Sequence, residues 1–413
     1  MKKVWRALAA CTAALAFSVC ASVGVAGGFT SDSYRITPGM SLSWRGGLLT
    51  ALPETEGGRA ADVSVQDTGK SFQAELTLFH AVPVKTVTVS VVPQRRVIPC
   101  GTPFGIKMFT NGVMVVGTAD IQTAEGMVNP ARLAGVQMGD IITSVNGQEV
   151  NRNEEIAALV EQSGGQTVSL CFSRQGEQHE TKLQPVRSLV DGAWKAGVWV
   201  RDSTAGIGTL TYYDPETGSF GGLGHGVCDT DTSELMPFLT GEILPVTING
   251  VTKGKKGVPG ELHGYFAGDE AVGTMWANDE AGVYGTLYES PAGMAVPVAL
   301  RQEVRPGRAS ILATIDDAGP QYYEVMIEQV DYRDETEGKN MVLHVVDQKL
   351  LDATGGIVQG LSGSPILQNG KLVGAVTHVF VNDPTRGYGI FAESMLAAGG
   401  EAAETAAERA VSP

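Results

Sequence analysis

The residues best suited to do chemistry are a serine and its glycine neighbours, Gly360-Leu361-Ser362-Gly363-Ser364-Pro365. Glycine gives the backbone freedom to expose the Ser362 hydroxyl and to aim amides at one point. An acyl-transfer site needs this combination of a nucleophile and N–H donors around the developing oxyanion. The amides of Gly360 and Ser362 are the candidate donors. Gln368-Asn369-Gly370 then separates two apolar runs and predicts a β-hairpin after the serine loop.

A second glycine-rich run contains a histidine, Gly221-Gly222-Leu223-Gly224-His225-Gly226. Histidine is the natural general base near neutral pH, and glycine neighbours let another segment approach its ring. We therefore predict that His225 is the base for Ser362. His378, in the strand after the hairpin, is the rival candidate. Either motif by itself is more often structural, but the two together favour catalysis.

A third group should orient the base and stabilise its imidazolium. Many aspartates are available for this role, and spacing alone does not choose among them. The candidates are Asp229, Asp231, Asp269, Asp316, Asp317, Asp331 and Asp347.

Charge and cysteine content exclude other classes of protein. The formal net charge is −15 over 413 residues, which disfavours binding to nucleic acid phosphates. Three scattered cysteines beyond the first 28 residues, Cys100, Cys171 and Cys228, make no disulfide framework. There is no Cys or His spacing typical of a metal site, so we expect neither a metal nor an organic cofactor.

The beginning of the chain predicts export. Lys2, Lys3 and Arg6 precede an uncharged stretch that runs to Gly28. This is typical of a signal peptide and is also long enough for a membrane anchor. Residues 29–98 are predicted to be a small β-rich region, because positions 86–91 alternate between polar and apolar residues. Residues 397–413 lack turn chemistry and a core pattern, so we expect a disordered tail.

Residues 100–187 form a second predicted unit. Asn129 precedes Pro130 as an N-cap would, and 153–162 is an amphipathic helix. The run from Asn129 to Gly147 resembles bacterial PDZ domains. The resemblance implies that Phe104, Gly105 and Ile106 form the carboxylate-binding loop and that peptide C-termini pair with a strand edge. A PDZ fold with an empty groove is the alternative.

Residues 190–396 alternate short apolar runs with glycine, as a barrel or sandwich does. A glycine-flanked serine loop before a hairpin is similar to chymotrypsin-like peptidases. We therefore expect a mainly β chain with a signal or anchor, a small β region, an α+β PDZ domain and a chymotrypsin-like double β-barrel peptidase domain.

Taken together, these parts resemble the SpoIVB (stage IV sporulation protein B) peptidase family. The most specific segments are 355–366 and 374–385. The resemblance implies that Ser362 is the nucleophile, His225 the base and Asp347 the acidic partner. Leu361 departs mildly from the family, where Met usually precedes the nucleophile.

The resemblance also implies a function. Such a peptidase is exported between forespore and mother cell, cleaves itself, and cleaves the extracytoplasmic part of a membrane-bound inhibitor of an intramembrane protease. That protease then processes a late sigma-factor precursor. Two alternatives are a catalytically inert PDZ-led binding protein and a structural protein of the spore envelope.

Overall fold

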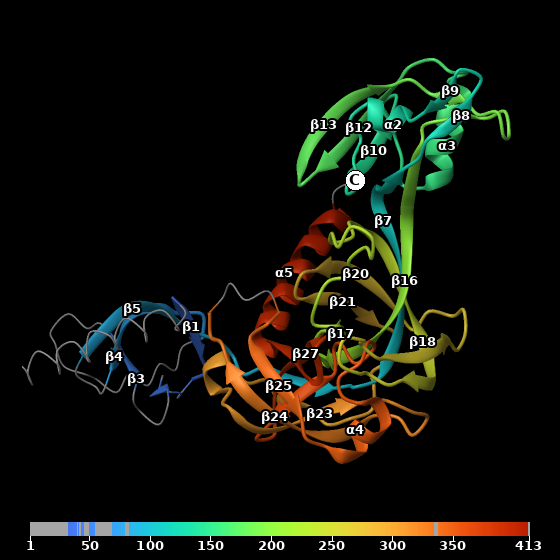
Figure 1. The fold of residues 1–413 in the computed structure, drawn as a ribbon. Helices are drawn as coiled ribbons and strands as arrows, with labels where there is room; N and C mark the ends of the chain where they lie inside the picture. The colour runs from blue at the N-terminus through green and yellow to red at the C-terminus, as the bar shows by residue number, and fades with distance from the viewer. Residues whose placement is uncertain are drawn as a thin grey trace, which may run out of the picture.

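The computed structural model describes residues 32–38, 40, 43–44, 49–53, 68–78, 82–333 and 338–411. Figure 1 shows a small amino-terminal sheet, a large body of β-barrels, and a further unit at the far end of two long strands. The signal or anchor predicted over residues 1–28 lies outside the described residues. Within the described ranges, no helix is long and apolar enough to cross a membrane.

The amino-terminal unit is a five-stranded sheet in the order β1-β5-β4-β3-β2. Val87, Val89 and Val91 are buried on one face, which confirms the strand predicted from the alternating residues. The strands are β1 (Ser33–Ile36), β2 (Ser43–Trp44), β3 (Leu49–Pro53), β4 (Ser71–Leu78) and β5 (Val82–Val91).

The PDZ unit has a core of its own, built from Val113 to Ala196. Asn129 caps the first helix as predicted, because its side chain accepts a hydrogen bond of 3.0 Å from the Arg132 amide. The elements are β8 (Ile121–Thr123), β9 (Gly126–Val128), α2 (Pro130–Leu133), β10 (Ile141–Val145), β11 (Gln148–Glu149), α3 (Asn153–Gln162), β12 (Val168–Arg174), β13 (Glu177–Leu183), β14 (Val186–Arg187) and β15 (Trp194–Lys195).

Two 16-residue strands join the PDZ unit to the barrels: β7 (Pro103–Thr118) and β16 (Val198–Tyr213). They pair antiparallel from Val198↔Thr118 to Thr209↔Pro103 and run side by side in Figure 1. The PDZ unit is therefore an insertion between two strands of the first barrel. The sequence predicts that the PDZ domain begins at residue 100. The first half of β7 instead belongs to the first barrel, because β16 and β18 form hydrogen bonds with its two edges.

The first barrel closes through the circuit β7-β18-β20-β21-β17-β16 and back to β7. Its core includes Phe104, Met108 and Phe220. The remaining elements of this half are β6 (Arg96–Pro99), β17 (Ser219–Gly222), β18 (Phe238–Thr252), β19 (Glu261–Phe266), β20 (Gly273–Asp279), β21 (Gly282–Leu287), β22 (Val296–Pro297) and the short η2 (Arg301–Glu303).

The second barrel is closed in the order β23-β24-β25-β28-β27-β26. The predicted hairpin is present: Asn369 and Gly370 have φ of 51° and 74° between β26 and β27. The elements are β23 (Gly307–Ala313), β24 (Gln321–Val330), β25 (Met341–Val345), α4 (Gln348–Thr354), β26 (Pro365–Gln368), β27 (Lys371–Phe380) and β28 (Asp383–Phe391).

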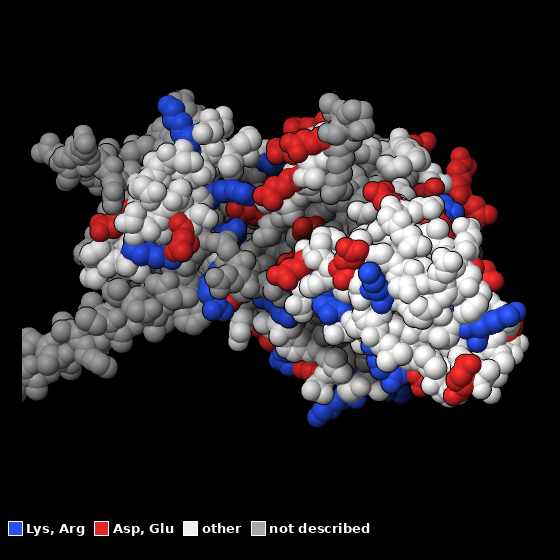
Figure 2. Space-filling view, turned by 90° about the horizontal axis from the view of Figure 1, so that it is seen from above, with Lys and Arg blue, Asp and Glu red and all other residues white. Residues whose placement is uncertain are grey.

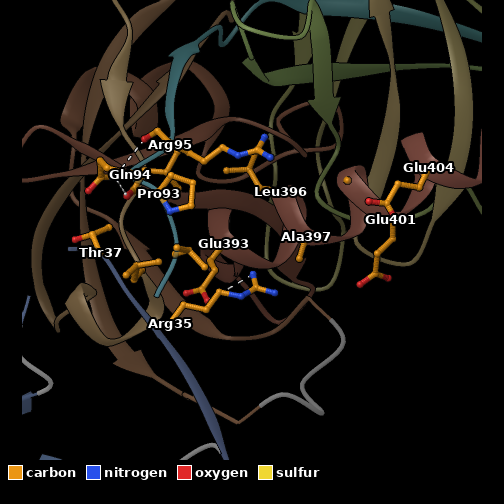
Figure 3. Close-up of a pocket in the computed structure, with 14 residues that line it drawn as sticks. Arg35, Thr37, Pro93, Gln94, Arg95, Glu393, Leu396, Ala397, Glu401 and Glu404 are labelled. Carbon is orange, nitrogen blue, oxygen red and sulfur yellow. Dashed lines mark hydrogen bonds and ion pairs between the residues drawn. The ribbon is translucent and has the colours of Figure 1, made fainter. Parts of the chain in front are cut away.

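The expected disordered tail is wrong over most of its length, because α5 (Ala392–Val411) is helical. Alanine and glutamate are strong helix formers, and Met395 anchors the helix with a fully buried side chain. Glu393 is also buried and pairs with Arg35 of the amino-terminal sheet. These two side chains face each other at a cavity of about 340 Å³ that α5 shares with residues 92–95 (Figure 3).

Charged side chains of both signs share one face of the molecule. Figure 2 shows Asp and Glu side chains distributed over one face of the molecule with Lys and Arg between them. No continuous basic surface appears on that face among the described residues.

Candidate active site

The serine loop connects α4 to β26 and has the backbone shape that the sequence predicted. Gly360 and Gly363 both have φ of +96°, a region that favours glycine. A Cβ on Gly363 would lie 2.0 Å from the Thr209 carbonyl oxygen, so this residue must be glycine for the loop to pack on β16. Ser362 is half-buried, whereas Ser364 is fully buried. Accessibility therefore favours Ser362 over Ser364 as the nucleophile.

The first barrel holds this loop through Thr209 and Thr211 of β16, and Thr209 makes two of the contacts. The Thr209 amide donates to the Ser362 carbonyl at 3.0 Å, and the Thr209 hydroxyl donates to the Gly360 carbonyl at 2.7 Å. The amides of Gly360 and Ser362 have no hydrogen-bond acceptor among the described residues. They are the two donors predicted for the oxyanion hole.

His225 reaches the same place from the first barrel, on the loop that follows β17. Gly224 has φ of +70°, and a Cβ there would come within 3.1 Å of Thr377 and Ile390 in the second barrel. Glycine therefore lets the histidine loop lie directly against the second barrel. His225 Nδ1 is 2.8 Å from the Gly226 carbonyl oxygen, which selects the tautomer with the proton on Nδ1 and leaves Nε2 as the basic nitrogen.

The environment of His225 keeps its ring neutral. Burial lowers the pKa of His225 below its ordinary value, and the bond to the Gly226 carbonyl opposes this only in part. A neutral imidazole is the form that can accept a proton from serine.

One cavity of about 470 Å³ between the two barrels contains the predicted nucleophile and base. Ser362, His225 and His378 all line it, together with residues of β16. The Ser362 hydroxyl donates to the Thr377 carbonyl at 2.7 Å. No hydrogen bond joins it to the His225 ring in the described part of the chain. The structure thus brings the two groups to one site with the hydroxyl bound to a backbone carbonyl.

His378, the rival base, stands beside His225. The two ring centroids are 4.8 Å apart, and the pKa of His378 is lowered to about 4 by desolvation and by the charges of His225 and Lys339. The ring of His378 is exposed at the cavity surface. It forms a wall of the cavity next to the base.

The structure does not bring Asp347 to His225. Asp347 is the N-cap of α4, where its carboxylate accepts from the Leu350 amide at 3.1 Å and the Glu324 amide at 3.2 Å. No hydrogen bond or ion pair connects it to His225 among the described residues, and it does not line the cavity. The group that contacts Nδ1 is instead the Gly226 carbonyl. The role of Asp347 as the acidic partner stays a prediction.

Another of the candidate aspartates also has a structural partner. Asp229 is buried and pairs with Arg201 of β16. Its pKa is lowered although burial opposes this, because backbone amides of Thr232 and Asp231 and the charge of Arg201 stabilise the carboxylate.

The predicted carboxylate-binding loop of the PDZ domain is wrong. Phe104, Gly105 and Ile106 lie inside β7 in the first barrel, and Phe104 and Ile106 belong to its core. A carboxylate-binding loop needs free amides, but this stretch is paired with β16 on one edge and β18 on the other.

Two features of the site could not be found from the sequence motifs. Thr209 of β16 contacts the serine loop across the fold, and the contact of the Gly226 carbonyl with His225 Nδ1 depends on the conformation of the histidine loop. The described residues contain no cluster of three or more His, Cys, Asp or Glu side chains able to hold a metal ion.

Two closed β-barrels, with a serine from one and a histidine from the other meeting in a shared cavity, define the class as a serine peptidase. Comparison with known families agrees. Residues 192–396 match the model described as SpoIVB peptidase S55, and residues 129–174 match the PDZ domain model. The chain belongs to the SpoIVB peptidase S55 family and carries a PDZ domain.

Two curated proteins are similar to the chain over short stretches. The chain is 43% identical over 56 residues to the zinc metalloprotease RasP of Shouchella clausii, which is 14% of this chain and 13% of that protein. It is 40% identical over 55 residues to a probable periplasmic serine protease do/HhoA-like of Haemophilus influenzae, 13% of this chain and 12% of that protein. The chain thus spans about an eighth of the length of these two relatives.

Among solved structures, the inactive form of Rv3671c from Mycobacterium tuberculosis matches with 15% identity and a TM-score of 0.23. The match covers 39% of this chain and 82% of that one.

Proposed function

We propose that the chain is an exported serine endopeptidase that cleaves itself and the extracytoplasmic part of a membrane-bound regulatory complex. The complex would contain an inhibitor of an intramembrane protease, and its cleavage would trigger processing of a late sporulation sigma-factor precursor. Membership of the SpoIVB peptidase S55 family supports this target, and the composition of residues 1–28 supports export to the space between forespore and mother cell.

The observation that carries the catalytic part is the shared cavity. Ser362 and His225 line it from opposite barrels, and the amides of Gly360 and Ser362 have no acceptor among the described residues. In the reaction, the Ser362 hydroxyl leaves the Thr377 carbonyl, and His225 Nε2 takes its proton as Oγ attacks a peptide carbonyl.

The carbonyl oxygen of the substrate becomes negative during this attack and is held by the two free amides. Each such donor contributes about 3–4 kcal/mol to lowering the barrier in other serine peptidases. Protonated His225 then gives its proton to the leaving amine, and an acyl-enzyme remains on Ser362. Water deprotonated by His225 releases the new C-terminus and restores the serine.

The test compares residues 29–413 as the unchanged chain, as Ser362→Ala and as Ser364→Ala. Self-cleavage is followed by intact mass, and the nucleophile is labelled with a fluorophosphonate. We expect cleavage and labelling in the unchanged chain, their loss in Ser362→Ala, and their retention in a folded Ser364→Ala. Equal self-cleavage in Ser362→Ala would overturn the assignment. Absence of both readouts in the unchanged chain would instead support an inert PDZ-led binding protein.

A further inference from the structure

Asn278 of β20 makes three hydrogen bonds to the histidine loop, which is residues 223–237 between β17 and β18. The Val227 amide donates to Asn278 Oδ1 at 2.7 Å. The side-chain amide of Asn278 donates to the carbonyl oxygens of Val227 and Met236, each at 2.9 Å. A Cβ on Gly226 would lie 2.9 Å from the Asp279 carbonyl oxygen, so the loop packs directly on the end of β20.

The three bonds require a carboxamide at position 278. Its oxygen accepts from an N–H group, and its nitrogen donates to two carbonyl oxygens. A flipped amide would place like groups against each other at all three contacts, so the orientation is unambiguous. An aspartate of the same size would offer no donor to the two carbonyls when ionised, and a leucine would offer neither donor nor acceptor. The register of β20 on β21 shifts between Met275 and Ala277, and such a bulge re-aims the side chains near it.

One of these bonds acts on the peptide unit that holds the catalytic base. The Gly226 carbonyl and the Val227 N–H belong to the same planar peptide unit, which turns as a rigid body. On one side its oxygen is 2.8 Å from His225 Nδ1, and on the other its N–H donates to Asn278. The direction of the N–H therefore fixes the direction of the carbonyl. Hydrogen bonds at the two ends of one peptide unit also strengthen each other.

The Gly226 carbonyl is the group that contacts Nδ1 of His225 in the described part of the chain. The titratable side chains that line the cavity with His225 are His378 of β27 and Cys228 of the histidine loop. No Asp, Glu, Lys or Arg side chain lines that cavity among the described residues. The orientation of this one peptide unit therefore decides which nitrogen of the neutral ring carries the proton.

We propose that Asn278 is a positioning residue for the catalytic base. Through the peptide unit of Gly226 and Val227 it keeps the proton of neutral His225 on Nδ1 and leaves Nε2 free to take the proton of Ser362. Asn278 and this peptide unit together orient His225 as a carboxylate does in a Ser-His-Asp triad, but without a negative charge. This inference rests on the proposed peptidase function and adds a residue outside both catalytic loops.

Removal of Asn278 should change the pKa of His225 in a direction that distinguishes two roles. Burial lowers the pKa of His225, and the bond to the Gly226 carbonyl raises it in part. When Asn278→Ala frees the peptide unit to turn, the imidazolium loses that acceptor and the pKa falls further. A variant that only loosens the loop would instead admit water, and the pKa would return toward its ordinary value of 6.5.

The experiment measures the rate at which a fluorophosphonate labels Ser362 in the full-length chain as a function of pH. A serine peptidase whose base has the wrong tautomer loses about 10⁴-fold in rate, and the Gly226 carbonyl is displaced but not removed, so Asn278→Ala should label about 10–100-fold more slowly. The midpoint of the acidic limb should move to lower pH. A rate within about twofold of the unchanged chain, or a midpoint that moves toward 6.5, would overturn the proposal.

Thr232→Ala is the matched control on the same loop. The Thr232 hydroxyl accepts from the Glu234 amide at 3.2 Å and lies 3.7 Å from the sulfur of Met114. Thr232 does not line the catalytic cavity. Thr232→Ala should keep its labelling rate within about twofold and its midpoint unchanged, because the base does not depend on this contact. Equal losses of rate in both variants would show that the stability of the loop alone sets the rate, and the positioning role would fail.

A second measurement decides the case if Asn278→Ala does not fold. The nitrogen chemical shifts of a chain with isotopically labelled histidine show which ring nitrogen carries the proton, and His225 is identified as the signal that His225→Gln lacks. In the unchanged chain, neutral His225 should carry its proton on Nδ1. A proton on Nε2 of the neutral ring would contradict the proposal.

The outcomes separate this proposal from the proposed function. Without labelling of Ser362 in the unchanged chain, the peptidase function itself fails. With labelling that depends on Ser362 and His225 but not on Asn278, only the positioning role of Asn278 fails.

Discussion

Thr209 is expected to position the oxyanion hole, and Thr209→Val tests this. Valine keeps the shape of the side chain but removes the hydroxyl that donates to the Gly360 carbonyl at 2.7 Å. Gly360 then loses the bond that fixes its backbone, and its φ of +96° is in a region where glycine moves easily. Thr209 is not among the residues that line the catalytic cavity, so it acts by holding the loop.

Thr209→Val is expected to lower both the stability of the protein and the rate at which Ser362 is acylated. Leaving a partly buried carbonyl without a donor costs about 1 kcal/mol of stability, the lower end of the usual range. Complete loss of one oxyanion donor lowers the rate roughly 10²–10³-fold. Because the Gly360 amide is displaced but not removed, we expect the acylation rate to fall about 10–100-fold, an effect larger than the stability loss explains.

The assay is the second-order rate at which a fluorophosphonate acylates Ser362, with thermal unfolding measured on the same samples. Thr211→Val is the matched control. Its hydroxyl donates to the Gly363 carbonyl at 2.7 Å in a fully buried place, but the Gly363 amide is held by Val376 and is not an oxyanion donor. Thr211→Val should lose at least as much stability and keep its acylation rate within about twofold. Equal loss of rate in both variants would refute the positioning role.

Three further predictions follow from the site and from α5. Asp347→Asn keeps a good helix cap, so turnover should stay within about threefold, whereas a loss near 10⁴-fold would show the acidic role that the family implies. The pKa of His225 is lowered and its neutral ring is the base, so activity should persist as pH falls. In a profile of kcat/KM against pH, the midpoint of the acidic limb should lie below 6.5, the ordinary pKa of histidine. A midpoint above 6.5 would show a carboxylate beside the ring. A Cβ on Gly400 would meet open space, so Gly400→Ala should stabilise the fold by up to about 1 kcal/mol through helix propensity and raise the melting temperature. A Cβ on Gly399 would lie 2.9 Å from the Tyr284 ring, so Gly399→Ala should lower the melting temperature. A rise in both variants would show that α5 does not pack as described.

The reactive segments could be predicted from the sequence because they depend on local backbone chemistry. The φ values of Gly360, Gly363 and Gly224 are ones that glycine adopts easily, and the hairpin at Asn369-Gly370 is set by its own turn residues. The strand over residues 86–91 and the cap at Asn129 are local in the same sense.

The failures arose where contacts distant in sequence decide. A Phe-Gly-Ile stretch is compatible with a loop or a strand, and its pairing with β16 and β18 in the first barrel chose the strand. The Ala- and Glu-rich end of the chain has no core pattern of its own. It is helical where Met395 and Glu393 find partners supplied by the barrels and the amino-terminal sheet.

The sequence by itself determined the serine and histidine loops, the family, and the presence of a PDZ unit, because each is written in a short run of residues. Only the tertiary structure decided that the PDZ unit is inserted between β7 and β16 and that Thr209 holds the serine loop. It also decided that Asp347 caps a helix away from the cavity and that β16 extends from the PDZ unit to the cavity that contains Ser362. The physical reason is that strand pairing and barrel closure join segments more than 100 residues apart, as Thr209 and Gly360 are, and no local pattern records which edges remain free.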